Sequence, residues 1–239
     1  MTNLRGTSTL RAALLVLAVG CGPSAPAAST PAAPAGAPPG AEHHHPGAMV
    51  HRFEDAEAWA KVFDDPERDA WQHPDEVVGA LGLSPTMTVA DVGAGTGYFT
   101  VRLARAVPGG QVIATDIEPD MVRYLGERAR RESLANVRAV LAAADDPRLE
   151  PGTVDRILVV DVWHHIADRG RYAQGLARAL RPGGQVAIVD FTQEATHGPP
   201  REHRLRPDVI MADLRSAGLD AAISPARLPD QFIVIGSRR

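Results

Sequence analysis

Three glycines alternate with other residues directly after a short apolar run. The run contains Asp91 near its end, and the glycines are Gly93, Gly95 and Gly97. Glycine has no Cβ, so the backbone at these positions can approach a ligand closely. An amphipathic helical pattern follows, and the start of a helix presents free N–H groups and a positive dipole end at the same point. This stretch therefore predicts a strand, a glycine turn and a helix that form a nucleotide-type pocket.

The spacing of the turn restricts the kind of nucleotide. The glycines form G-x-G-x-G, whereas the dinucleotide fingerprint places its third glycine one residue later and a P-loop needs G-x-x-x-x-G-K-[ST]. No lysine or arginine lies between Asp91 and Val101 to meet a phosphate. The carboxylate of Asp91 suits a cationic or amine-bearing ligand, or it caps N–H groups of the turn. The next apolar run ends in Asp116, where an acid can hold ribose hydroxyls.

Four motifs, in this order, resemble those of class I S-adenosylmethionine-dependent methyltransferases, in particular the small-molecule branch that includes quinone-biosynthesis enzymes. The motifs are Val89–Gly97, Asp116, Asp155–Ile166 and Leu180–Phe191. The resemblance implies S-adenosyl-L-methionine as cofactor and methyl donor. The cofactor-binding residues that we expect are Asp91, Gly93, Ala94, Gly95, Thr96, Gly97, Asp116, Ile117, Asp145, Asp146 and Asp161. One of Asp145 and Asp146 is expected to meet the adenine amino group, and the other to cap a turn.

Helical and strand-like patterns alternate from residue 53 onward, which predicts an α/β fold with a doubly wound sheet. The resemblance implies a Rossmann-like sheet of seven strands, mostly parallel with one antiparallel strand, and helices on both faces. We expect a methyltransferase core over residues 88–239 and an N-terminal helical cap over 49–87. The expected strands are 88–92, 111–116, 136–141, 156–161, 185–191, 219–224 and 231–237, and the expected helices include 54–63, 75–81 and 169–180.

Candidate acceptor-side residues follow the fourth expected strand and lie in the cap. Methyl transfer from a sulfonium mainly requires positioning and desolvation, and a base is needed only when the acceptor must lose a proton. His164 is the predicted base, with His165 as the second candidate, because histidine titrates near neutral pH; a core-facing structural histidine is the alternative for both. We expect Trp163 on the cofactor or substrate. Trp71 and Gln72 are expected either in a lid that contacts substrate or in a cap on the sheet.

The first 48 residues differ in composition from the rest. Arg5 and Arg11 precede a short apolar run, Ala12–Gly20, which leads to Cys21, the only cysteine. This pattern predicts a signal peptide over residues 1–20 and, by its resemblance to a bacterial lipobox, lipidation of Cys21. Residues 21–48 form a Pro/Ala-rich tether, and three adjacent histidines at 43–45 are interpreted as part of it, with no metal site. We expect a lipid-anchored protein of the bacterial cell envelope, or a cytoplasmic protein if Cys21 is not lipidated.

Charge and motifs together limit the partners. The net charge is −4, which does not favour nucleic acid. The predicted function is methyl transfer to the O, C or N atom of a small or lipid-like acceptor. The alternative is a non-catalytic S-adenosyl-ligand-binding protein of the envelope, because an exported enzyme would be separated from a cofactor made in the cytoplasm. The sequence does not specify the oligomeric state.

Overall fold

The computed structural model describes residues 54–239. The predicted signal peptide, Cys21 and the tether lie outside the described residues, as does the start of the predicted cap. Within the described part of the chain, no helix combines the length and the apolar character that a membrane span requires.

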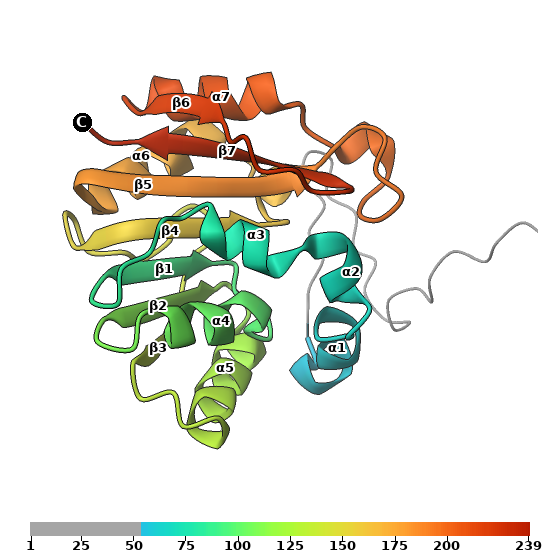
Figure 1. Ribbon diagram of the computed structural model, residues 1–239, viewed down its shortest axis with the longest axis vertical. Helices are drawn as coiled ribbons and strands as arrows, with labels where there is room; N and C mark the ends of the chain where they lie inside the picture. The colour runs from blue at the N-terminus through green and yellow to red at the C-terminus, as the bar shows by residue number, and fades with distance from the viewer. Residues whose placement is uncertain (1–53) are drawn as a thin grey trace, which may run out of the picture. The chain divides into compact units, whose positions relative to one another are not determined.

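Seven strands form a single sheet in the order β3-β2-β1-β4-β5-β7-β6 (Figure 1). The strands are β1 Thr88–Val92, β2 Gln111–Asp116, β3 Val137–Leu141, β4 Val154–Val160, β5 Leu180–Phe191, β6 Asp220–Ile223 and β7 Gln231–Ser237. β7 runs antiparallel to β5 and β6, and the other neighbouring pairs are parallel. This arrangement confirms the predicted fold class. Chain order reverses between β1 and β4, so a crevice is expected at the carboxyl ends of these strands.

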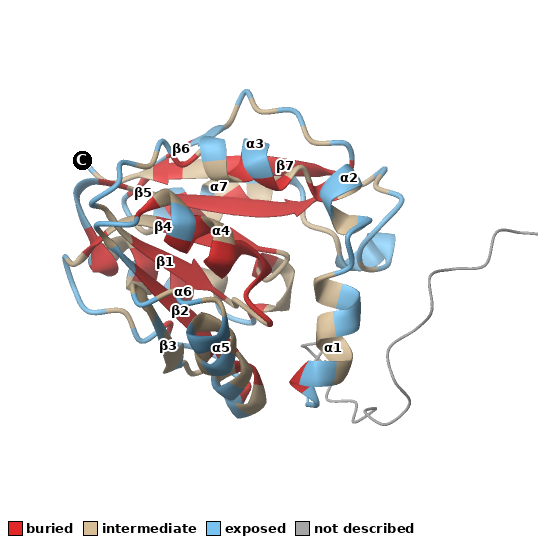
Figure 2. Cartoon of the chain, turned by 60° about the horizontal axis from the view of Figure 1, so that its bottom comes forward, coloured by how far each residue is buried: buried red, intermediate tan, exposed pale blue. Residues whose placement is uncertain are grey.

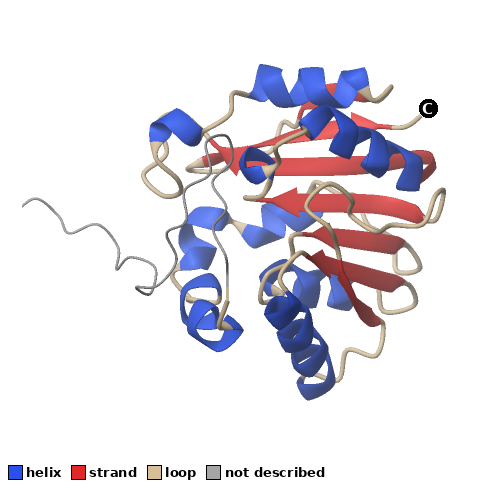
Figure 3. Cartoon of the chain, turned by 180° about the vertical axis from the view of Figure 1, so that it is seen from behind, coloured by secondary structure: helices blue, strands red, loops and turns tan. Residues whose placement is uncertain are grey.

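Helices cover both faces of the sheet (Figure 3). They are α1 Ala56–Phe63, α2 Arg68–Gln72, α3 Pro74–Gly79, α4 Tyr98–Ala106, α5 Pro119–Arg131, α6 Arg169–Ala179 and α7 Pro207–Ser216, with short 3-10 helices at Trp163–His165 and Arg201–His203. Alternate residues of β4 point to opposite faces. Ile157 and Val159 join a buried cluster with residues of α6 and α7, whereas Leu158 and Val160 join one with residues of α3 and α4. Figure 2 shows the central strands as buried.

Some element bounds differ from the predicted ones for a local reason. The helix predicted over 169–180 ends at Ala179, and the strand predicted over 185–191 already begins at Leu180. Leu180 pairs with Val154 of β4, so the ladder starts before the Pro-Gly-Gly turn. The charged segment before residue 74 contains α2, which the sequence pattern did not reveal. His73 links α2 to α3 with a left-handed backbone, at φ 48°.

Contacts with α5 hold α1 in place. The backbone N–H of Ala56 donates to Asp120 Oδ2 at 2.7 Å, and Arg123 pairs with Glu57 at 2.8 Å. At the other end of α1, Arg128 Nη1 donates to Asp64 Oδ1 at 2.8 Å. These contacts hold α1 beside α5, the helix that follows β2. They therefore position the end of α1 next to the glycine turn.

Candidate active site

The ends of four parallel strands bring the chemistry-bearing residues to one edge of the sheet. Gly93 follows β1, Asp116 ends β2, Asp161 follows β4 and Asp190 lies one residue before the end of β5. These strands are adjacent and parallel, so their carboxyl ends meet at the same edge. The predicted cofactor residues of the glycine turn and of strands 2 and 4 are therefore neighbours in the structure.

The glycine turn is held by the acid of the next strand. Asp116 Oδ2 accepts from the backbone N–H of Gly95 at 2.8 Å, and its Oδ1 accepts from that of Glu118 at 3.0 Å. Burial raises the pKa of Asp116, and these backbone donors oppose that shift. Ile117 follows with 49% of its surface exposed. The Asp116 carboxylate thus contacts the turn, and the exposed apolar side chain of Ile117 follows it in sequence.

The turn also meets the criteria for a ligand cradle. Gly93, Gly95 and Gly97 have φ values of 71°, 54° and 93°, which side chains rarely adopt. A Cβ at Gly95 would lie 3.5 Å from the ring of Phe63 in α1, so the cap lies directly over the turn. The hydroxyl of Thr96 is buried and has no hydrogen-bond partner among residues 54–239. A close backbone approach and an unpaired buried hydroxyl fit a polar ligand such as S-adenosylmethionine.

Asp91 connects β1 to the helix behind the turn. Its Oδ2 accepts from the Thr100 hydroxyl of α4 at 2.6 Å, and burial raises the pKa of Asp91 to about 6. In one of the two roles predicted for Asp91, its carboxylate caps N–H groups of the turn. Two of these donors have other partners: Gly95 donates to Asp116, and Gly93 donates to the Thr115 carbonyl at 2.8 Å. In this structure, Asp91 therefore links β1 to α4, the two elements that flank the turn.

Asp161 lies in a polar network that joins β4, β7 and α2. Its backbone is left-handed, at φ 59°, and its Oδ1 accepts from Gln231 Nε2. Arg68 Nη2 lies 3.7 Å from Asp161 Oδ2, and Arg68 Nε donates to Gln72 Oε1 at 2.8 Å. Gln72 Nε2 in turn donates to Gln231 Oε1. Burial raises the pKa of Asp161 to about 7. Strain in the backbone and a shifted pKa at a strand end are features of functional sites.

Two arginines from other parts of the chain reach the glycine turn. Arg68 of α2 is partly buried, its guanidinium stacks at 4.1 Å over the ring of Tyr98, the residue after the turn, and its Nη1 donates to the Phe63 carbonyl at 2.8 Å. Burial lowers the pKa of Arg68. Arg128 of α5 donates to the Thr96 carbonyl at 3.0 Å. The sequence of the turn contains no basic residue, so it did not predict these two cations, which come from α2 and α5.

The predicted base, His164, is paired with an acid that the sequence analysis missed. His164 Nδ1 lies 3.0 Å from Asp190 Oδ1 and 3.2 Å from its Oδ2, and only 3% of the imidazole is exposed. The ring of His165 lies 4.2 Å from that of His164. Asp190 is an acid near the carboxyl end of a strand, the same signal that identified Asp116. Gln231 offered no such signal, since its partner Asp161 is 70 residues away in the chain.

The two predicted tryptophans have different environments. Trp163 is fully buried, its indole N–H donates to Asp213 Oδ2 at 3.1 Å and its ring contacts Tyr172 edge-on. The expectation that Trp163 packs on cofactor or substrate is not supported, because its ring belongs to the core beneath α6 and α7. Trp71 instead lies at the site. It stacks on His197 with ring centroids 4.8 Å apart and on Phe191 at 6.0 Å.

The two acids predicted for adenine lie on the surface after β3. Asp145 Oδ2 pairs with Arg171 at 3.3 Å. Asp146 Oδ1 accepts from the backbone N–H of Arg148 at 2.8 Å, and its backbone bridges to Ala143. Asp146 is therefore the residue that closes this turn.

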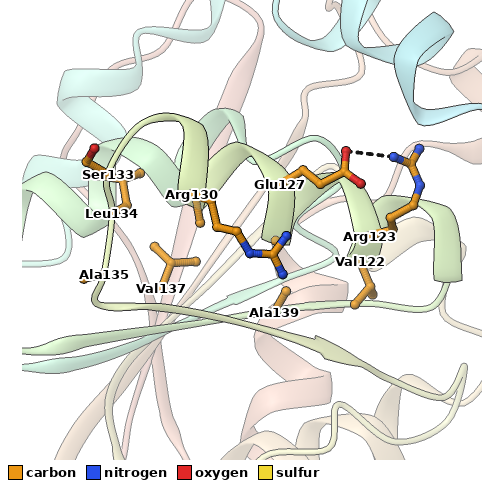
Figure 4. Close-up of a pocket in the computed structure, with 11 residues that line it drawn as sticks. Val122, Arg123, Glu127, Arg130, Ser133, Leu134, Ala135, Val137 and Ala139 are labelled. Atoms are coloured by element: carbon orange, nitrogen blue, oxygen red, sulfur yellow. Dashed lines mark hydrogen bonds and ion pairs between the residues drawn. The ribbon is translucent and has the colours of Figure 1, made fainter.

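A surface groove lies away from these residues, between α5 and the edge strand β3 (Figure 4). Its volume is about 790 Å³, and it is lined by Val122, Arg123, Gly126, Glu127, Ala129, Arg130, Ser133, Leu134, Ala135, Val137 and Ala139. None of the predicted site residues in the described range lines it, so the groove is separate from the site at the strand ends.

Comparison with known proteins agrees with this geometry. Residues 89–184 match a family described as a methyltransferase domain. An uncharacterized methyltransferase of Mycobacterium bovis is 35% identical over 136 residues, which are 57% of this chain and 53% of that protein. The ubiquinone/menaquinone biosynthesis C-methyltransferase UbiE of Idiomarina loihiensis is 31% identical over 118 residues, 48% of this chain and 47% of that one. The chain thus spans about half the length of these curated relatives.

A solved structure extends the similarity to nearly a whole protein. A SAM dependent methyltransferase from Aquifex aeolicus is 28% identical, with a TM-score of 0.71, and the match covers 77% of this chain and 99% of that one. The family match over residues 89–184 includes the glycine turn, Asp116 and the end of β4, which carry the site described above. The chain contains a class I S-adenosylmethionine-dependent methyltransferase domain.

Proposed function

We propose that this protein transfers a methyl group from S-adenosylmethionine to a small or lipid-like acceptor. The observation that carries the proposal is the joint placement of Asp116 and Ile117 at the glycine turn. Asp116 holds Gly95 and stands where an acid can accept hydrogen bonds from ribose hydroxyls. The exposed side chain of Ile117, directly after it, offers an apolar surface for the adenine ring.

The amino acid end of the methyl donor is assigned to the polar network under α2. This end carries a carboxylate and an ammonium group. Arg68 supplies a partly buried cation and Asp161 a carboxylate, with 3.7 Å between Nη2 and Oδ2. A pair of opposite charges suits a zwitterion, since each charge gains a partner without leaving the other uncompensated. Gln72 and Gln231 hold the two side chains in this arrangement.

We assign the adenine amino group to Asp145. Asp146 is committed to the turn through its bond with the Arg148 N–H, whereas Asp145 is held only by an exposed ion pair with Arg171. Such surface pairs contribute little free energy, about 0–1 kcal/mol. Asp145 can therefore exchange its partner for a ligand at small cost.

A relative and an aromatic side chain support this acceptor class. The UbiE relative is named as a C-methyltransferase of ubiquinone/menaquinone biosynthesis, which supports a ring-containing, lipid-like acceptor for this chain. The partly exposed ring of Trp71, which stacks on the buried Phe191, provides aromatic surface beside the site.

The test is methyl transfer by the purified chain with radiolabelled S-adenosylmethionine and bacterial envelope extract. We expect label in a small or lipid-soluble product. Binding of the donor without any transfer, in both envelope and cytosolic extracts, would instead favour the non-catalytic binding protein. A chain heated to unfold it serves as the control for label that transfers without enzyme.

We further propose that the protein is anchored in the bacterial envelope through lipid on Cys21. The support is the charged and apolar pattern before the only cysteine. Membrane fractionation of wild type and Cys21→Ala is the measurement. We expect wild type in the membrane fraction and the variant outside it; identical partitioning of both proteins as soluble material would contradict the anchor and support a cytoplasmic location.

A further inference from the structure

The sheet has an open edge at β3 (Figure 1). Among residues 54–239, β3 pairs with β2 alone, and none of its five residues is buried. Ala142, directly after the strand, donates its N–H to the Asp116 carbonyl, and every second residue back along β3 also faces β2. The residues between them, Val137, Ala139 and Leu141, therefore direct their backbone groups to the open edge.

This edge lacks the features that keep an edge strand unpaired. Natural proteins protect such strands with prolines, bulges or charges that point along the edge. β3 contains no proline and pairs with β2 without a register shift. Its one charged residue, Arg138, points to the face opposite that of Val137 and Ala139. Leu141 is 51% exposed. On the face that carries α5, the edge is therefore regular and apolar, which favours pairing with another strand.

The groove between α5 and β3 is lined by this same edge strand (Figure 4). Val137 and Ala139 contribute from the strand, and Gly126 and Ala129 from the helix. The small side chains on the helix leave room for another element to approach closely. A strand added to β3 therefore meets a recess on the α5 face that a second helix can fill.

The two ends of α5 carry opposite charge. Near its start, three carboxylates share Arg123, which are those of Glu57, Asp120 and Glu127. Near its end, Arg130 and Arg131 are exposed, and neither forms an ion pair within residues 54–239. Two α5 helices that run antiparallel would bring the acidic start of each beside the basic end of the other. The charge pattern is thus complementary to itself.

We propose that β3 and α5 bind the same elements of a second copy of this chain, in a two-fold dimer with one continuous sheet. In an antiparallel register centred on Ala139, the two Ala139 residues exchange both backbone hydrogen bonds. Each Leu141 N–H donates to the Val137 carbonyl of the other copy. The Val137 N–H already donates to the Leu134 carbonyl at 3.2 Å. Every outward N–H group of the strand therefore gains an acceptor.

The same register suits the side chains on both faces of the sheet. On the α5 face, Leu141 lies opposite Val137 of the other copy, so its exposed side chain gains an apolar neighbour. On the other face, Arg138 lies opposite Val140, so the two Arg138 side chains are not directly opposed. Like charges directly opposite each other would be destabilising.

The helices fit this arrangement as well. Opposed residues of antiparallel strands share a face, so both α5 helices lie on one face of the joined sheet. Each α5 contacts β2 and β3. Strands lie about 4.8 Å apart, so helices that each cover two strands lie about 10 Å apart, which agrees with ordinary helix packing. Glu127 of one copy then faces Arg130 of the other. The carboxyl ends of the strands point in opposite directions in the two copies, so both sites stay open.

Sedimentation equilibrium of the full chain carrying Cys21→Ala tests the inference, because neither a lipid nor a disulfide can then join two copies. We expect a reversible dimer. Leu141→Lys should raise the dimer dissociation constant by about 30-fold or more, the effect of losing a central interface contact. Ile223→Lys is the matched control. Ile223 is 53% exposed on β6, the other edge of the sheet, and its replacement should leave the dissociation constant unchanged.

Charge reversal tests whether the partner is a second copy. Glu127→Arg and Arg130→Glu should each weaken the dimer by about tenfold, because each like-charge contact occurs twice in a two-fold dimer. The double variant should restore association, since opposite charges again face each other. Amide hydrogen exchange gives a local readout: the N–H groups of Ala139 and Leu141 should become protected as the chain concentration rises, but not in Leu141→Lys.

A mass of one chain at about 100 μM, above the μM range of weak interfaces of standard size, would overturn the inference. The edge would then be left to residues 1–53 or to another protein. The inference is also overturned if Ile223→Lys dissociates the dimer and Leu141→Lys does not, or if the double charge variant is folded and monomeric. The interface does not depend on the proposed methyl transfer, so S-adenosylmethionine should bind to the monomeric variants as it binds to wild type.

Discussion

Asp116→Ala is expected to weaken binding of S-adenosylhomocysteine by about 1.5–3 kcal/mol, the magnitude of a lost hydrogen bond to a charged group. This corresponds to roughly a 10–150-fold increase in Kd. The loss has two physical sources. The ribose hydroxyls lose a buried carboxylate acceptor, and the Gly95 N–H, at 2.8 Å in wild type, loses the group that fixes the turn. Isothermal titration calorimetry measures the change directly.

Asp208→Ala is the matched control for the removal of a carboxylate. Asp208 is exposed and pairs with Arg206 at the start of α7. Its Kd should equal that of wild type. Asp116→Asn should fall between Ala and wild type, since the amide oxygen still accepts one hydrogen bond. If Asp116→Ala binds as tightly as the control, the ribose site is misplaced.

Gly93→Ala is expected to lower the free energy of unfolding by about 2–5 kcal/mol. A left-handed backbone costs a residue with Cβ about 1–2 kcal/mol, and overpacking adds about 1–3 kcal/mol. Gly93 has φ 71°, and a Cβ there would overlap the Val162 side chain after β4. Both the turn and the segment that carries Asp161 would have to shift. Urea denaturation measures the loss.

Gly82→Ala is the control that separates the cost of a left-handed backbone from the cost of steric overlap with Val162. Gly82 also has a positive φ, at 56°, but a Cβ there meets no atom within 4 Å. This variant should lose only the backbone part, about 1–2 kcal/mol. The double variant Gly93→Ala with Val162→Ala should regain part of the overlap cost. Equal losses for the Gly93 and Gly82 variants would show that the turn is not packed against β4 in the way described.

The fold was predictable because its signals are local. Alternating helices and strands, the glycine turn and the acid that ends β2 all lie in continuous stretches, so the sheet and the position of the crevice followed from them. The same strand-end rule would have identified Asp190, which ends a run as apolar as that before Asp116.

The rest of the site depends on contacts between distant residues. Arg68 meets Asp161 over 93 positions of sequence, and Gln72 meets Gln231 over 159. Nothing near these residues in the chain indicates their partners. Trp163 was predicted at the site because it follows β4. Its ring instead lies in the core, where it donates to the Asp213 carboxylate and packs with residues of α6 and α7. Side-chain direction at a strand end is set by tertiary packing, which sequence position alone does not specify.

The most direct test of the central claim is calorimetric titration of the wild-type chain with S-adenosylmethionine and S-adenosylhomocysteine. The arrangement of the glycine turn, Asp116, Asp161 and Arg68 predicts saturable binding of both ligands at one site per chain. NADH and ATP, whose phosphates find no cradle in the G-x-G-x-G turn, should not bind there. Absence of binding by both S-adenosyl ligands, in a chain shown to be folded, would contradict the assignment of this site.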